Sequence, residues 1–168
     1  MVFIDESGTH LGMERDYARS PKGERAYDSK PAHPRGIQNI VGALGFNGLR
    51  TSMVTGDSID GGLFLAFVTE FLLPTLNSGD IVITDNHKIH RVAGVQEKIE
   101  ASGASYLFLP RYSPDLSPIE EFWSKVKSYL RKIGARTKEV LAKATVEAFD
   151  TVILDDIKGW FKHCGYCT

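Results

Sequence analysis

The stretch GDIVITDNHKIHRVAGVQEKIEASGASYLFL, residues 79–109, has the pattern of a strand, a helix and a second strand. Ile81–Thr84 and Tyr106–Leu109 are short apolar runs, which are typical of buried strands. Between them, Val92–Ser102 carries apolar residues at helical spacing and is followed by Gly103, a common helix stop. This unit predicts two parallel strands joined by a right-handed crossover.

The sequence on either side of this unit supplies the other elements of a mixed sheet. Val2–Asp5 is a β-rich run, and the runs Ile37–Leu44 and Leu49–Thr55 flank a glycine-containing turn, as in a hairpin. Gly62–Leu76 has one apolar helical face. Three further helices are expected at Pro118–Ile133, Thr137–Phe149 and Leu154–Phe161. The predicted fold class is therefore α/β, a mixed five-stranded sheet with helices on both faces.

Composition and charge exclude several classes of protein. A chain of 168 residues, 42% of them hydrophobic, predicts a single domain over residues 1–168 with a real core. The 20 basic and 21 acidic side chains exclude a polybasic protein, so nucleic acid would have to bind a local patch. No apolar run reaches about 18 residues, so no membrane segment is predicted. Two cysteines and no secretory signal predict a cytoplasmic location.

Two aspartates follow apolar strands of the predicted sheet. Asp5 comes directly after Val2-Phe3-Ile4, and Asp85 comes directly after Ile81–Thr84. Because a right-handed crossover places these strands side by side, both carboxylates are expected at one edge, where such sheets bind ligands. Two carboxylates there repel each other unless a cation lies between them, and oxygen ligands suit Mg²⁺ or Mn²⁺. The alternative is that each aspartate only caps the turn after its strand.

A third acid is expected at the start of the helix predicted over residues 118–133. Ser117-x-x-Glu120 fits a capping box, which would explain Glu120 without any function. At about 100° per residue, Glu120 lies at the edge of the core-facing stripe, whereas Glu121 faces water. Only Glu120 is therefore expected to reach a metal held by the two aspartates.

The flank of this helix that carries Glu120 is basic. Residues 111–138 hold seven basic and three acidic side chains. Such a run is usually a solvated face, but beside a metal site it suits a phosphate backbone. The predicted DNA contacts are Arg111, Ser124, Lys127 and Arg131.

Three strings resemble the catalytic core of mariner-superfamily DDE transposases, most closely the bacterial insertion-sequence branch with Glu as third acid. They are Phe3-Ile4-Asp5-Glu6-Ser7, Thr84-Asp85-Asn86-x-x-x-His90 and LPRYSPDLSPIEEFWSKVK over residues 109–127. The proline-rich string before Glu120 is the most specific, and the resemblance runs from residue 3 to about 150. Ser117 stands where the family usually has Asn, and both residues cap helices.

The resemblance implies a ribonuclease H-like fold in which Asp5, Asp85 and Glu120 hold two divalent ions, Mg²⁺ with Mn²⁺ as a substitute. Asp5 would bridge the ions, and the other two acids would each complete one. The implied activity is DNA strand cleavage at transposon ends and transfer of the 3′ ends into target DNA. Asn86 and His90 would support the second aspartate, although a loop histidine bonded to backbone is the alternative.

The resemblance also implies partners. The loop Gly8–Gly36 carries several arginines with Tyr17 and Tyr27, and an insertion at this place clamps the partner subunit in mariner relatives. A homodimer acting on double-stranded DNA is therefore expected, in the bacterial cytoplasm beside the nucleoid. Relatives carry an N-terminal helix-turn-helix region, which is not found before Asp5. This chain is therefore expected to be a catalytic fragment, a second reading frame or a decayed copy, with a DNA-recognition domain that is separate or missing. The alternatives are a domesticated or nuclease-dead interaction module of the same fold and a related ribonuclease H-like nuclease.

Overall fold

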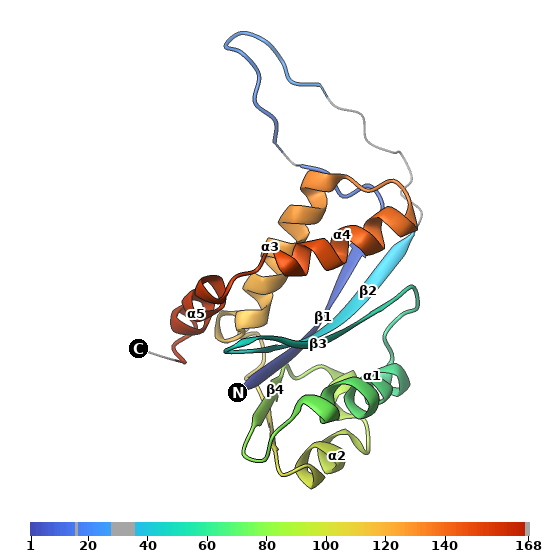
Figure 1. Cartoon of the computed structure of the whole chain (residues 1–168), viewed down its shortest axis with the longest axis vertical. Coiled ribbons are helices and arrows are strands. Elements are labelled where there is room, and N and C mark those ends of the chain that lie inside the picture. The colour runs from blue at the N-terminus through green and yellow to red at the C-terminus, as the bar shows by residue number, and fades with distance from the viewer. Residues whose placement is uncertain (16, 28–35, 167–168) are drawn as a thin grey trace.

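The computed structural model describes residues 1–15, 17–27 and 36–166 and contains the predicted mixed sheet (Figure 1). The strand order is β3-β2-β1-β4-β5. β1, β2 and β3 pair antiparallel, whereas β4 runs parallel to both β1 and β5. The strands are β1 (Val2–His10), β2 (Ile37–Gly45), β3 (Gly48–Thr55), β4 (Ile81–Thr84) and β5 (Ser105–Phe108).

Helices cover both faces of this sheet, as predicted (Figure 1). Because alternate strand residues point to opposite faces, Phe3 packs in one core while Val2 and Ile4 pack in the other. The core with Phe3 is covered by α3 (Pro118–Ile133), α4 (Lys138–Asp150) and α5 (Leu154–His163). The opposite core is covered by α1 (Gly61–Phe67) and α2 (Val95–Ala101).

Four short helical turns complete the elements. The single helix predicted over residues 62–76 is divided, because α1 continues as a π turn, Val68–Leu72, and a 3-10 turn, Leu73–Thr75. Pro74 lies in the last piece and lacks the N–H that a regular α-helix would use. The two other 3-10 turns are Lys88–Arg91 and Pro114–Leu116. None of the described helices is long and apolar enough to cross a membrane.

Strand β1 is longer than the sequence predicts. The expected strand ended at Asp5, but β1 continues to His10 and pairs with β2 along its whole length. Its pairing with β4 stops at Ile4, which lies opposite Thr84. The second half of β1 is polar, so no apolar run indicated it. Thr9 is nevertheless buried, and its hydroxyl donates to the Gln38 carbonyl oxygen at 3.2 Å.

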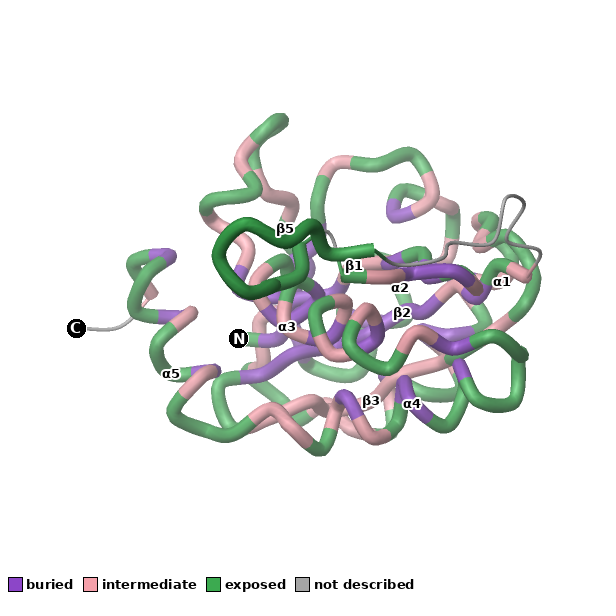
Figure 2. Tube along the Cα trace, turned by 90° about the horizontal axis from the view of Figure 1, so that it is seen from above, coloured by how far each residue is buried: buried purple, intermediate pink, exposed green. Residues whose placement is uncertain are grey.

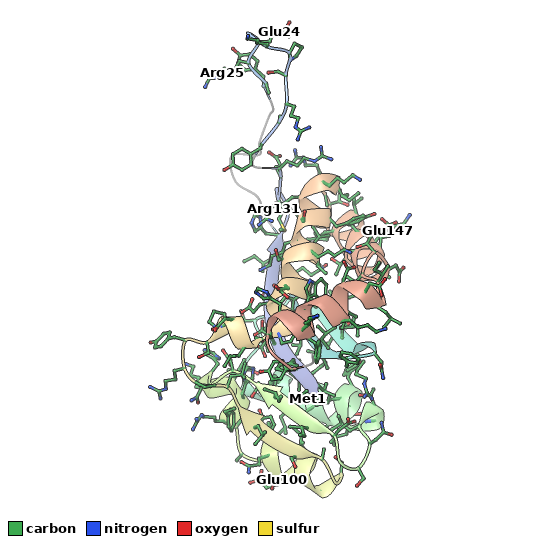
Figure 3. The ribbon with its side chains drawn as sticks, turned by 90° about the vertical axis from the view of Figure 1, so that its left-hand side faces the viewer. Met1, Glu24, Arg25, Glu100, Arg131 and Glu147 are labelled. Atoms are coloured by element: carbon green, nitrogen blue, oxygen red, sulfur yellow. The ribbon has the colours of Figure 1, made fainter. Side chains whose placement is uncertain are left out.

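Residues 17–27, between β1 and β2, form an arm that projects from the body, with Glu24 and Arg25 at its tip (Figure 3). Residues 11–15 and 17–27 contain no helix or strand, in agreement with the predicted loop. The arm is largely exposed (Figure 2), and the exposed fractions of Tyr17 and Tyr27 are 90% and 86%. Residues 28–35, which include Pro31, Pro34 and Arg35 of the predicted loop, lie outside the described residues.

Candidate active site

The three predicted acids line one cleft of about 400 Å³. Asp5 comes from β1, Asp85 follows β4, and Glu120 lies in the first turn of α3. Two loops complete the wall, residues 86–87 after β4 and 109–117 before α3. The expectation that both aspartates gather at one edge of the sheet agrees with this geometry.

Asp5 lies inside β1 rather than after its end, which corrects the predicted position. It is the first residue of β1 beyond the pairing with β4, so its carboxylate still lies at the edge where β4 ends. Its Oδ2 accepts a hydrogen bond of 3.1 Å from Nε1 of Trp123. Burial, together with the negative charges of Glu6, Glu120 and Asp85, raises the pKa of Asp5 to about 8. A carboxylate in such surroundings is costly unless a cation joins it.

Asp85 is held by His90, a completely buried side chain. His90 Nδ1 lies 2.6 Å from Asp85 Oδ1, and its Nε2 lies 2.8 Å from Glu6 Oε1. Burial alone would lower the pKa of His90, but its hydrogen bonds to Asp85 and Glu6 raise that pKa to about 10. The ring is therefore an imidazolium that donates from both nitrogens, and the bond from His90 lowers the pKa of Asp85.

The alternative roles expected for Asp85 and His90, capping a turn and bonding the backbone, are partly correct. Asp85 Oδ1 also accepts the His87 backbone N–H at 2.9 Å, so Asp85 does cap its turn. His90 Nδ1 lies 3.3 Å from the Asp85 carbonyl oxygen, but its contact with the carboxylate is shorter. Asn86 also lines the cleft, and its Oδ1 accepts a bond of 2.6 Å from Arg91 Nε. Asp5 caps no turn, because it lies within a strand.

Glu120 and Glu121 point to different surroundings. Ser117 is the N-cap of α3, but its side chain makes no capping hydrogen bond, so the capping-box interpretation of Glu120 is wrong. Glu120 is exposed at the cleft, and its charge raises the pKa of Asp5. Glu121 does not face water as expected: it is half-buried, with Oε1 3.9 Å from Nε2 of His163 at the end of α5. Glu120 therefore lines the cleft and Glu121 does not, while the role of Glu120 as third metal ligand stays a prediction.

The four predicted DNA contacts do not share one surface. Arg111 is exposed and lines the carboxylate cleft. Ser124 and Arg131 instead line a second hollow, together with Tyr17 of the arm. Figure 3 shows Arg131 close to the base of the arm. Lys127 is half-buried on α3 and lines neither hollow.

Sequence reasoning missed two residues of this site. Trp123 was expected only in the core, and it is 2% exposed, yet its indole also bonds Asp5. A buried indole N–H needs an acceptor, which was the available signal. Glu6 gave no comparable signal, because its partner His90 lies 84 residues away in the chain.

The chemistry of the three acids fits a hard divalent cation, but they are not gathered around one point. Within residues 1–15, 17–27 and 36–166, no three His, Cys, Asp or Glu side chains lie close enough to hold an ion. Asp5 and Asp85 are held by Trp123 and His90, whereas Glu120 is exposed. Gathering the acids therefore requires rotation of side chains, for which Glu120 has the most freedom.

Comparison with known proteins identifies the family. The family model described as DDE superfamily endonuclease matches residues 1–142. Among curated proteins, no sequence matches. The solved structures that match include the Mos1 transposase paired-end complex with left transposon end, with a TM-score of 0.78 and 16% identity over 97% of this chain and 51% of that chain. They also include the catalytic domain of Mos1 mariner transposase, with a TM-score of 0.72 and 14% identity over 97% of this chain and 76% of that chain.

The coverage and sequence identity of these matches show how far the likeness to Mos1 extends. The chain spans about half the length of the Mos1 chain in the paired-end complex. At this level of identity the likeness is one of fold, and it confirms the predicted ribonuclease H-like architecture. The family match is independent of it and covers most of the chain, including all three acids of the cleft. The chain therefore belongs to the DDE superfamily endonucleases and has the fold of a mariner-type transposase catalytic domain.

Proposed function

We propose that this chain is the catalytic domain of a DNA transposase, which cleaves strands at transposon ends and transfers the 3′ ends into target DNA. The observation that carries this proposal is the cleft beyond the end of β4, which Asp5, Asp85 and Glu120 all line. The family match supports endonuclease chemistry, and the similar Mos1 structures include complexes with transposon ends. The presence of all three acids favours an active enzyme over a nuclease-dead module of the same fold.

Asp5, Asp85 and Glu120 would hold two Mg²⁺ ions, with Mn²⁺ as a substitute. Mos1 paired-end complexes with Mn and with Mg are among the similar structures, which supports this choice. When bound, such ions activate the attacking water or hydroxyl and stabilise the leaving oxygen. Trp123 and His90 hold the two aspartates in place beforehand, so less reorganisation is left for the reaction itself.

Double-stranded DNA is the proposed substrate. Arg111, at the cleft, is placed to bind a backbone phosphate near the scissile bond. Ser124 and Arg131 would contact the duplex further along α3, beside the arm. We also propose that the protein is a homodimer held together through the arm. A further domain would recognise the transposon ends. The protein would act in the bacterial cytoplasm.

Nicking of supercoiled plasmid DNA with Mn²⁺ tests the activity. Wild type is expected to nick the plasmid, and Glu120→Gln is expected to abolish nicking with little change in melting temperature, because Glu120 is exposed and forms no capping box. Glu121→Gln is the matched control and is expected to keep activity. Inactivation by Glu121→Gln instead would overturn the site, and inactive wild type that binds no Mn²⁺ would support the nuclease-dead module.

A further inference from the structure

We propose that Trp123 and Gly42 form a positioning pair for Asp5, in which the indole N–H holds the carboxylate and Gly42 leaves room for the ring. The metal-binding consequence of this pair rests on the proposed function, whereas the contact itself does not. Trp123 lies on α3, Gly42 on β2 and Asp5 on β1, so three elements meet at one carboxylate.

The first observation is where the indole N–H of Trp123 goes. The ring is packed in the core between the sheet and α3, with Phe122 at a ring-centroid distance of 4.9 Å. Its only polar atom reaches Asp5 Oδ2 at 3.1 Å, across 118 residues of chain. Phenylalanine is also an apolar aromatic side chain suited to a core, but it carries no donor. The donor at this position therefore serves the carboxylate rather than the packing.

The second observation is the missing side chain at Gly42. Gly42 lies directly opposite Asp5 in the pairing of β1 with β2. A Cβ at this position would lie 2.8 Å from Cη2 and 3.0 Å from Cζ2 of Trp123, too close for either atom to stay. Gly42 is not among the glycines with positive φ, so its backbone conformation does not demand glycine. Room for the indole ring is what the position requires.

The third observation is that Asp5 is the acid with most need of such a donor. The negative charges of Glu6, Glu120 and Asp85 all repel its carboxylate. Asp85 already has His90 as a partner. Loss of the indole N–H, or displacement of the ring, would therefore weaken metal binding by leaving Asp5 unheld.

Two variants disturb this contact in different ways, and each has a matched control. Trp123→Phe removes the N–H, with Trp160→Phe as the control at the other tryptophan of the chain. Gly42→Ala displaces the ring, with Gly8→Ala as the control, because a Cβ at Gly8 meets nothing closer than Asn39 Oδ1 at 3.6 Å. Circular dichroism and melting temperature establish that each variant is folded.

Calorimetric titration with Mn²⁺ is the first measurement. Residues that orient metal ligands typically contribute about 10- to 100-fold to metal affinity. We expect a loss of this size in Trp123→Phe and in Gly42→Ala, and changes below about twofold in the controls. The double variant should lose no more than Trp123→Phe alone, since both changes act on one contact. Unchanged affinity in folded Trp123→Phe would overturn the positioning role.

The indole N–H signal in NMR tests the contact without metal. In the Trp160→Phe background the single indole signal belongs to Trp123. Asp5→Ala removes the acceptor of the indole N–H, so the signal is expected to move upfield, and Gly42→Ala should move it in the same direction. A moved signal in a protein that binds no Mn²⁺ would support the contact and contradict the proposed function. An unmoved signal would overturn the contact, whatever the protein does with metal.

Discussion

Asp5 makes the folded protein sensitive to pH, because its pKa is raised to about 8 by burial and by neighbouring carboxylates. An unfolded aspartate titrates near about 3.9. Between these two values the folded chain keeps a proton that the unfolded chain releases, so the free energy of unfolding falls as pH rises. Above about pH 8 Asp5 is charged in both the folded and the unfolded chain, and the free energy of unfolding falls no further on its account.

We therefore expect Asp5→Asn to stabilise the metal-free protein at neutral pH, by up to about 4 kcal/mol. The amide cannot ionise, so the decline between about pH 4 and about pH 8 should be smaller in the variant. Melting temperatures across this range, measured with a chelator present, check the prediction. Parallel profiles for wild type and variant would contradict it.

His90 titrates in the opposite sense but over a higher range of pH. Its pKa is raised to about 10, against about 6.5 when unfolded, so its contribution is complete below pH 6.5 and is lost as pH rises through 10. We expect His90→Ala to cost about 3 kcal/mol near pH 6, because Glu6 and Asp85 lose their shared partner. Urea unfolding near pH 6 and pH 10 should show a smaller cost at the higher value. His87→Ala, an exposed histidine of the same loop, is the control.

At the scale of elements, strand β1 serves both faces of the sheet. Successive strand residues point in opposite directions, so Asp5 reaches Trp123 of α3 while Glu6 reaches His90 on the other side. His90 packs against Phe64 of α1, with ring centroids 4.6 Å apart. Each aspartate of the cleft is therefore held from a different core of the protein.

Two basic residues of helix α3, Arg131 and Lys127, lie in different surroundings, and we therefore expect them to differ in DNA binding. Arg131 lines the hollow beside the arm, whereas half-buried Lys127 does not. If duplex DNA follows that hollow, Arg131→Ala should lower the slope of log affinity against log salt by about 0.9, and Lys127→Ala should leave it unchanged. Titration of one duplex at several salt concentrations measures both. Equal slopes for wild type and Arg131→Ala would make this hollow ordinary surface.

At the scale of the whole molecule, the arm is separable from the two cores. Its base is tied to the body by the Leu11 backbone N–H, which donates to the Gly36 carbonyl oxygen at 3.0 Å, and by an ion pair between Glu14 and Arg136. Met13, near this base, joins the core on the side of α3, and partly buried Leu11 packs against the same core. Beyond it, residues 17–27 are all exposed, so they contribute little to folding.

Replacement of residues 17–27 by a short glycine-rich linker is therefore expected to leave the melting temperature nearly unchanged. The same replacement should convert the proposed homodimer into a monomer, because the arm would supply the contact with the partner. Sedimentation equilibrium of wild type and the shortened chain checks both statements. A dimer that survives the replacement would place the interface elsewhere.

The sequence by itself determined most of the elements and the three acids of the cleft. Apolar runs and helical periodicity are local signals of burial, and they located β2 to β5 and the main helices to within a few residues. Gly134, with φ 62 and ψ 47, ends α3 where the sequence predicted its end. The string before Glu120 identified the acid that the structure places in the cleft.

Only the tertiary structure decided how those acids are held. The polar half of β1 is a strand because β2 pairs with it, and no local pattern reports such pairing. The bonds from Trp123 to Asp5 and from His90 to Glu6 join residues 118 and 84 positions apart. Hydrogen bonds of this kind depend on how α3 and the loop after β4 pack against the sheet, and therefore on distances that exist only in the folded chain.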